Sequence, residues 1–88
     1  MKRKRQGFYP LKISIKEYPD FSDRLKLAMY LRNCTVDELA ESTYMTKSTI
    51  YGYRAGHRSP NVNTLKLLAK ELDVSSDFLI GLQEEIYI

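Results

Sequence analysis

The spacing of hydrophobic positions changes once along this chain of 88 residues, just after Pro19. In 11–18, Leu11, Ile13 and Ile15 alternate with polar residues, which is the two-residue period of a half-buried strand. Proline cannot continue the hydrogen-bonded ladder of a strand, so we place the end of this strand at Pro19.

Beyond that proline, hydrophobic positions recur every three to four residues, as in amphipathic helices. Thr35, followed by Glu38 three residues later, forms a capping box, and Gly56 is suited to a helix C-terminus. Asn61 and Ser75 are further capping residues. The pattern predicts five helices: 21–32, 36–42, 47–55, 62–73 and a short one within 75–82.

These elements predict a mostly α fold in a single small domain. A basic N-terminal arm with a possible strand occupies 1–20, the helical domain 21–82, and a C-terminal stub 83–88. Because a single strand is not stable alone, we expect 11–18 to pair with the strand-like 86–88. Pairing within one chain and pairing across a dimer are both compatible with the sequence.

The second and third predicted helices, joined by a short turn, have the pattern of a helix-turn-helix. Side chains expected to lock them together are Leu39, Ala40, Met45, Ile50 and Tyr53. The outward face of the third helix is then nearly free of acids and consists of Lys47, Ser48, Tyr51, Gly52 and Ala55. In this motif the second helix enters the DNA major groove by its N-terminal end.

Charge is unevenly distributed, although the net charge is +3. Residues 1–20 contain six Lys/Arg and two acids, a net +4, whereas 21–88 contain eight Lys/Arg and nine acids, a net −1. The basic character therefore belongs to the N-terminal arm, whose cluster is Lys2, Arg3, Lys4 and Arg5. We expect this arm to follow phosphates or enter a groove, with a merely solubilising tail as the alternative.

Other functional classes find no support in the sequence. The lone Cys34 fits the helical pattern as a buried small hydrophobe in a reducing cytosol, so we expect a cytoplasmic protein, on the nucleoid if it is bacterial. His57 has no Cys, His or carboxylate cluster at ligand spacing, and we predict no metal, no cofactor and no enzymatic activity. No small-molecule site is evident, no apolar run is long enough for a membrane span, and the start lacks the apolar region of a secretory signal.

Three stretches carry a resemblance to a known family: "TVDELAE", "TKSTIYGYRAGHRSPN" and "LKLLAKELDVSSDFL". Over 22–82 the chain resembles the phage repressor/Cro-type helix-turn-helix family, also called XRE-type, whose members have a five-helix, lambda-repressor-like DNA-binding domain. The resemblance implies that Lys47, Ser48 and Gly52 occupy base-reading positions, with Tyr51 beside them. It implies phosphate contacts at Arg58 and near His57.

The chain departs from the family pattern in three places. Val36 stands where the family usually has a glutamine that contacts phosphate and supports a base-reading side chain. Tyr44 occupies a turn position usually held by glycine with positive φ, which is costly for tyrosine. Met29 and Arg54 replace an Arg–Glu pair, so we expect Arg54 to turn outward to a phosphate or to stack on Tyr30.

The resulting expectation is sequence-specific binding of double-stranded DNA by a transcriptional regulator, in the first place a repressor. A homodimer would bind two half-sites about one helical turn, ~34 Å, apart. The expected dimer contacts are Leu79, Ile80, Leu82 and 86–88, followed by 11–18. The alternative is a protein-interaction module, such as an antitoxin-like or anti-repressor subunit. The expected phosphate contacts are Thr46, Arg54, His57, Arg58 and the arm.

Gly52 is anomalous for a helix, because glycine in a helix interior costs about 1 kcal/mol relative to alanine. Our hypothesis at this level is that the missing side chain lets the helix backbone seat deeply in the groove.

Overall fold

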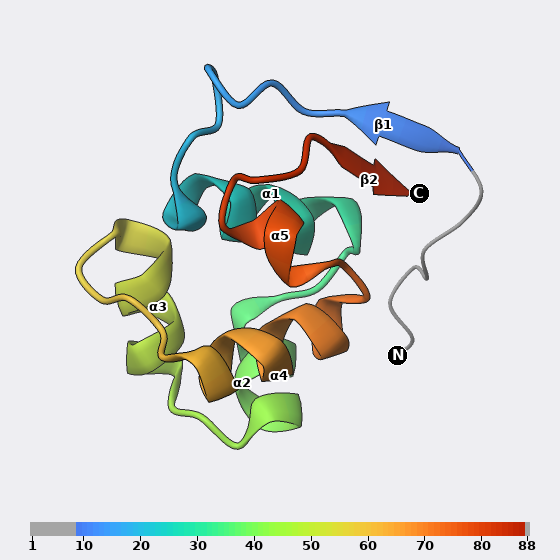
Figure 1. Ribbon diagram of the computed structural model, residues 1–88. Coiled ribbons are helices and arrows are strands. Elements are labelled where there is room, and N and C mark those ends of the chain that lie inside the picture. Colours follow the sequence, from blue (N-terminus) through green and yellow to red (C-terminus); the bar gives the residue numbers. More distant parts are fainter. Residues whose placement is uncertain (1–8, 88) are drawn as a thin grey trace.

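The computed structural model describes residues 9–87 and confirms the mostly α fold. Over this part of the chain, five helices lie between two short strands (Figure 1). The elements are β1 (Pro10–Lys12), α1 (Phe21–Leu31), α2 (Val36–Thr43), α3 (Lys47–Ala55), α4 (Val62–Leu72), α5 (Ser76–Leu79) and β2 (Glu85–Tyr87). The cluster of the basic arm and the last residue of the stub, Ile88, lie outside the described residues.

Side-chain caps fix where four of these helices begin. At each, the cap side chain accepts a hydrogen bond from the backbone N–H three residues later, over 2.8–3.1 Å. The four caps are Thr35, Thr46, Asn61 and Ser75. The backbone N–H of Thr35 in turn donates to Glu38 Oε1 over 3.0 Å, which completes the capping box. The helix starts therefore follow from local sequence signals.

One hydrophobic core joins all five helices and reaches the strands. Its fully buried members include Leu25, Leu39, Ile50, Leu68, Leu72, Phe78 and Leu79. Of the side chains expected between α2 and α3, four are buried, and Met45 is partly buried against the core. The ring of Tyr53 also meets Phe21 of α1 edge-on, with 5.9 Å between ring centroids. Cys34 is buried, as expected.

The two strands pair antiparallel within the chain, with Leu11 opposite Ile86. In Figure 1 they lie side by side at the top, nearest α1 and α5, whereas α2, α3 and α4 form the lower part. Ile13 and Ile86 are buried, so the strand pair extends the core.

The expected strand over 11–18 is wrong beyond residue 12, because the chain turns at Ser14. Its hydroxyl accepts from the backbone N–H groups of Lys16 and Glu17, over 3.1 and 3.4 Å. Its carbonyl also accepts from the N–H of Tyr18 over 2.9 Å. Serine thus supplies a local alternative to the strand ladder, and Ile15 is left 39% exposed instead of facing the core.

Arg24 of α1 is a buried side chain that the hydrophobic pattern did not predict. It is 0% exposed, and its guanidinium lies 4.7 Å from the ring centroid of Phe78. It donates to four backbone carbonyls over 2.6–3.0 Å, those of Ile13, Tyr18, Phe78 and Gln83. One side chain therefore fastens the segment after β1 and the segment before β2 to α1.

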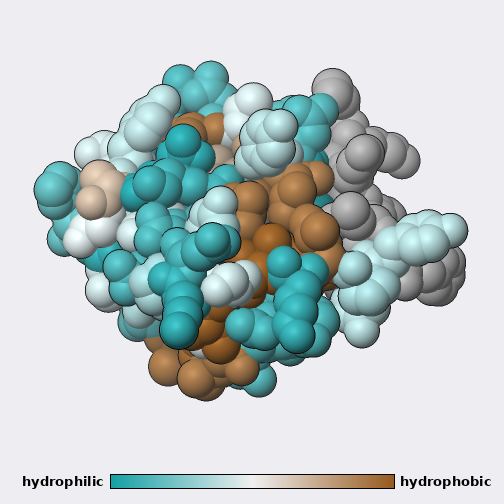
Figure 2. Space-filling view, turned by 90° about the horizontal axis from the view of Figure 1, so that it is seen from above, coloured by the Kyte–Doolittle hydropathy of each residue, from teal (hydrophilic) through white to brown (hydrophobic). Residues whose placement is uncertain are grey.

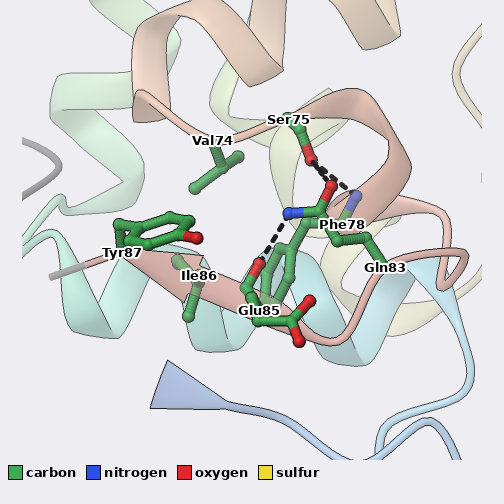
Figure 3. Close-up of a pocket in the computed structure, with 7 residues that line it drawn as sticks. All are labelled: Val74, Ser75, Phe78, Gln83, Glu85, Ile86 and Tyr87. Carbon is green, nitrogen blue, oxygen red and sulfur yellow. Dashed lines mark hydrogen bonds between the residues drawn. The ribbon is translucent and has the colours of Figure 1, made fainter. Parts of the chain in front are cut away.

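A second small network holds β2 against the N-terminus of α5 (Figure 3). The Ser75 hydroxyl donates to Gln83 Oε1 over 3.2 Å, and Gln83 Nε2 donates to the Glu85 carbonyl over 2.9 Å. The adjacent cavity, lined also by Ile86 and Tyr87, has about 70 Å³. This volume suits a few water molecules and is below the size of ordinary organic-ligand pockets.

Candidate nucleic-acid interface

The turn between α2 and α3 adopts the geometry that its position requires. Tyr44 has φ 58° and ψ 35°, the left-handed conformation, and its side chain is 97% exposed. The N–H of the next residue, Met45, donates to the Ala40 carbonyl over 3.0 Å. This bond closes the end of α2, so a tyrosine occupies the usual glycine position without altering the turn.

The N-terminal end of α3 is exposed and carries no acid in its first turn. Ser48 is exposed, and Tyr51 is 55% exposed one turn further along the same face. Lys47 reaches sideways to α2, where its Nζ lies 3.3 Å from the Asp37 carboxylate. Both side chains of this ion pair are mostly exposed. The expected base-reading face is therefore accessible, with one carboxylate at its edge.

The space beside Gly52 is occupied by Arg58. A Cβ placed on Gly52 would lie 2.9 Å from Cδ and 3.2 Å from Cγ of this arginine. The guanidinium Nη1 of Arg58 donates to the Thr49 hydroxyl over 3.2 Å. From the sequence, Gly52 is expected on the groove-facing surface and Arg58 in the following loop, with no contact between them. The available signal was Gly56, whose positive φ of 80° turns the chain back toward α3.

Arg54 does not turn outward as expected. Its guanidinium Nη1 lies 3.5 Å from the sulfur of Met29 on α1, and its side chain is half-buried. Tyr30, the other expected partner, is 81% exposed. The positions of the usual Arg–Glu pair thus still face each other, now as an arginine against a polarisable thioether.

The stretch free of acidic residues extends well beyond α3, and it contrasts with the acidic helix α2. From Tyr44 to Lys70 the sequence has no Asp or Glu, and it has five basic side chains: Lys47, Arg54, Arg58, Lys66 and Lys70. By contrast, α2 carries Asp37, Glu38 and Glu41. A surface on which positively charged side chains predominate attracts a polyanion.

The expected dimer contacts separate into buried and exposed residues. Leu79 and Ile86 are 0% and 3% exposed, so their assignment as dimer contacts is wrong, because both belong to the domain's own core. Ile80 and Leu82 are 42% and 71% exposed. Figure 2 shows apolar side chains gathered across the middle of the face that carries the strands.

Two further features bear on other classes of site. Within residues 9–87, no three His, Cys, Asp or Glu side chains are grouped so that they could hold a metal ion, and His57 is exposed. None of the helices in the same range combines the length and the apolar character needed to cross a bilayer.

Comparison with known proteins gives a consistent result. A helix-turn-helix family model matches residues 25–79. The chain is 32% identical over 65 residues to the uncharacterized HTH-type transcriptional regulator YobD of Bacillus subtilis, covering 74% of this chain and 58% of that protein. It is 30% identical over 67 residues to the HTH-type transcriptional activator BcrR of Enterococcus faecalis, covering 76% of this chain and 33% of that one. This chain thus spans between about a third and three fifths of these relatives.

A solved structure supports the fold. The restriction-modification controller protein C.AhdI of Aeromonas hydrophila superposes with a TM-score of 0.65 at 22% identity, covering 73% of this chain and 97% of that one. The matched residues 25–79 run from α1 to α5 and include the whole α2–turn–α3 unit. The chain belongs to the phage repressor/Cro-type, or XRE-type, helix-turn-helix family.

Proposed function

We propose that this protein binds double-stranded DNA sequence-specifically and regulates transcription, with α3 in the major groove. The observation that carries the proposal is the exposed N-terminal end of α3, set in a helix-turn-helix and followed by a stretch without acids up to Lys70. Shape and charge coincide there: the helix fits the groove, and its surroundings attract phosphates.

Each exposed side chain has a role in this proposal. Lys47, Ser48 and Tyr51 read base edges, since they project from the N-terminal half of α3. Thr46 at the start of α3, and His57 and Arg58 after its end, contact phosphates on either side of the groove. The arm residues Lys2, Arg3, Lys4 and Arg5 add phosphate contacts. Arg54 is left out of this set because its guanidinium faces α1.

The acting species is a homodimer on a two-fold-related operator, because one α3 covers only a few base pairs. We place the contact at Ile80 and Leu82, two apolar side chains that are exposed just after α5. The regulatory outcome that we propose is repression, since occupancy of an operator is enough to exclude polymerase. The relative BcrR is named an activator, so transcription from a promoter containing the selected site, with and without the protein, decides the direction.

Selection of bound sites from a random duplex pool tests the function. We expect one enriched motif with two-fold symmetry, and affinity that falls steeply between about 50 and 200 mM salt. Removing residues 1–7 should make that salt dependence shallower while leaving the motif unchanged. Recovery of no motif, together with salt-independent or undetectable DNA binding, would contradict the proposal.

The alternative is a protein-interaction module, and the exposed apolar surface at Ile80 and Leu82 is the observation in its favour. Pairing of β1 with β2 weakens it, because the two strand-like ends satisfy each other. The two functions separate experimentally: substitution of Ile80 and Leu82 by serine should reduce cooperative operator binding if the patch joins two DNA-bound copies. It should leave DNA binding untouched if the patch serves a different protein.

A further inference from the structure

We propose that Gly52 is a positioning residue: the absence of a side chain there seats Arg58 across α3 and aims its guanidinium at a DNA phosphate beside the groove. This inference rests on the proposed DNA binding. It replaces the hypothesis that the glycine brings the helix backbone close to the base pairs. The glycine then serves a contact made by another residue.

The position of Arg58 against α3 depends on backbone hydrogen bonds as well as on the missing Cβ of Gly52. The N–H groups of His57 and Arg58 both donate to the Gly52 carbonyl, over 2.9 and 3.3 Å. Gly56, with φ 80°, allows the reversal that brings these donors back. The methylenes of Arg58 then lie where a side chain at position 52 would begin. Any Cβ at that position would come within 2.9 Å of Arg58 Cδ, a separation that forces the arginine to move.

The far end of the arginine is held by one hydroxyl group at the start of α3, and a second hydroxyl group contacts the first. Arg58 Nη1 donates to Thr49 Oγ1 over 3.2 Å, and that oxygen lies 2.9 Å from Thr46 Oγ1. Thr46 is itself fixed as the cap that accepts from the N–H of Thr49 over 3.1 Å. The guanidinium is therefore anchored at the end of α3 that enters the groove, on the flank of the helix.

The anchored guanidinium keeps its capacity to bind an anion. Within residues 9–87 the Thr49 contact is its single hydrogen bond, and a guanidinium has five N–H donors. Its hydrogen-bond partner is a neutral hydroxyl group, and no acid occurs between Tyr44 and Lys70. Asp20 lines the same surface hollow as Arg58, but among the described residues the two form no ion pair. A long arginine normally loses rotamer freedom when it binds a phosphate, and a seated arginine has already lost part of it. Arginine and phosphate also match in geometry, which favours a phosphate as the ligand.

A double-mutant cycle tests the coupling between the two residues. We expect Gly52→Ala and Arg58→Ala each to weaken binding to the selected operator by roughly three- to tenfold and to reduce the slope of log K against log salt, by about 0.9 for Arg58→Ala. Because Gly52 acts through Arg58, Gly52→Ala should have no further effect in the Arg58→Ala background. An equal loss in both backgrounds would overturn the proposal and restore direct groove seating.

Two controls separate seating from helix stability. Ala55→Gly makes the reverse exchange one turn along the same face, and should change stability without changing the salt slope. Thr49→Val removes the hydroxyl at nearly constant volume, and should reduce affinity in the wild-type background but not in Arg58→Ala. A salt slope that follows helix stability across all these variants would contradict the positioning role.

A measurement without DNA distinguishes failure of this inference from failure of the proposed function. In the free protein we expect a nuclear Overhauser effect between the Hα protons of Gly52 and the Hδ protons of Arg58. In the Gly52→Ala variant the corresponding effect, from the Hα proton at position 52, should be lost because the arginine has moved. Its absence in the wild type overturns the seat, whatever the DNA result. If it is present while the wild type binds no DNA, the proposed function fails and the phosphate role fails with it.

Discussion

Two arginines organise different parts of this molecule, and they do so in different ways. Arg24 lies under the strands, is 0% exposed and donates to four backbone carbonyls. Arg58 lies on the surface along α3, and its guanidinium makes one hydrogen bond to a hydroxyl within residues 9–87. The same kind of side chain thus uses four of its five N–H donors on carbonyls in one region and one on a hydroxyl group in the other. Burial and the number of acceptors account for the difference.

The buried arginines are held by backbone carbonyls. Arg32 also donates to carbonyls, Nε to Leu72 and Nη2 to Asp73 at the end of α4, but its buried Nη1 has no hydrogen-bond partner within residues 9–87. Burial lowers the pKa of Arg24 and of Arg32 from the ordinary value, while Glu84 and Asp73 respectively oppose that shift. These two positive charges therefore hydrogen-bond inside the fold. The basic side chains of α3 and of the loop after it lie nearer the surface and can attract a polyanion.

The largest expected effect comes from removing the guanidinium of Arg24. Arg24→Met keeps an apolar stem but removes a donor from four carbonyls, of which that of Phe78 keeps a hydrogen bond from the Gly81 N–H over 3.2 Å. Each buried polar group left unsatisfied costs about 1–3 kcal/mol. We expect the free energy of unfolding, measured by urea denaturation, to fall by ~3 kcal/mol or more. The matched variant Arg58→Met should change it by about 0.5 kcal/mol or less, because that side chain is exposed. Similar losses for both would refute the contrast between the two arginines.

The next effect concerns base specificity in DNA binding by α3. Lys47→Ala should cost ~1–3 kcal/mol at one operator position and relax base preference there, if Lys47 reads a base edge. Quantitative binding to operators that carry each of the four bases at every position measures this. The control is Arg58→Ala, which should weaken all operators about equally. An even loss across sequences for Lys47→Ala would make it a phosphate contact instead.

Much of the helical fold could be predicted from the sequence. Helix starts follow from caps such as Thr35 and Asn61, and the α2–α3 core from Leu39 and Ile50, because these signals are local or periodic. The strand after Lys12 was overestimated because alternation in 11–18 competed with the Ser14 hydroxyl, whose local hydrogen bonds prevailed. Alternation reports which side chains are apolar and does not report such a competing turn.

The contacts that the two arginines make within the protein were beyond pattern analysis for a physical reason. A charged residue is expected at the surface, and Arg24 is buried only because carbonyls from distant parts of the chain converge on it. The contact between Gly52 and Arg58 depends on the reversal of the chain after α3. No periodicity in the sequence predicts which side chain that reversal brings against the helix. Long-range polar partners, unlike caps, have no fixed sequence spacing.

A smaller effect is expected at Tyr44, which is the strained residue of the recognition region. The left-handed conformation costs roughly 1–2 kcal/mol for a residue with a Cβ and little for glycine. Because this side chain is 97% exposed, little packing is lost on its removal. Tyr44→Gly should therefore raise the free energy of unfolding by up to ~1 kcal/mol, whereas Tyr44→Ala should be near neutral. Equal effects of both substitutions in urea denaturation would show that the ring, and not the backbone, determines stability there.

The smallest expected effect concerns the ion pair between Asp37 and Lys47. It tests whether Asp37 slightly lowers the affinity of α3 for DNA. Asp37 lies 3.3 Å from Lys47 at the edge of α3, and both side chains are largely exposed. Such pairs contribute little to stability, so Asp37→Asn should leave the fold nearly unchanged. It removes a charge that competes with DNA for Lys47 and repels phosphates, and we expect roughly two- to fivefold tighter operator binding at low salt, with a smaller gain at high salt. Asp23→Asn is the control, because Asp23 also forms an ion pair with a lysine, Lys26, at 3.8 Å on α1, although that pair is less exposed. Both variants change the net charge equally, so the difference between them isolates the position of the carboxylate. Equal gains for the two would mean that total charge alone governs binding, and that Lys47 is not a contact that Asp37 restrains.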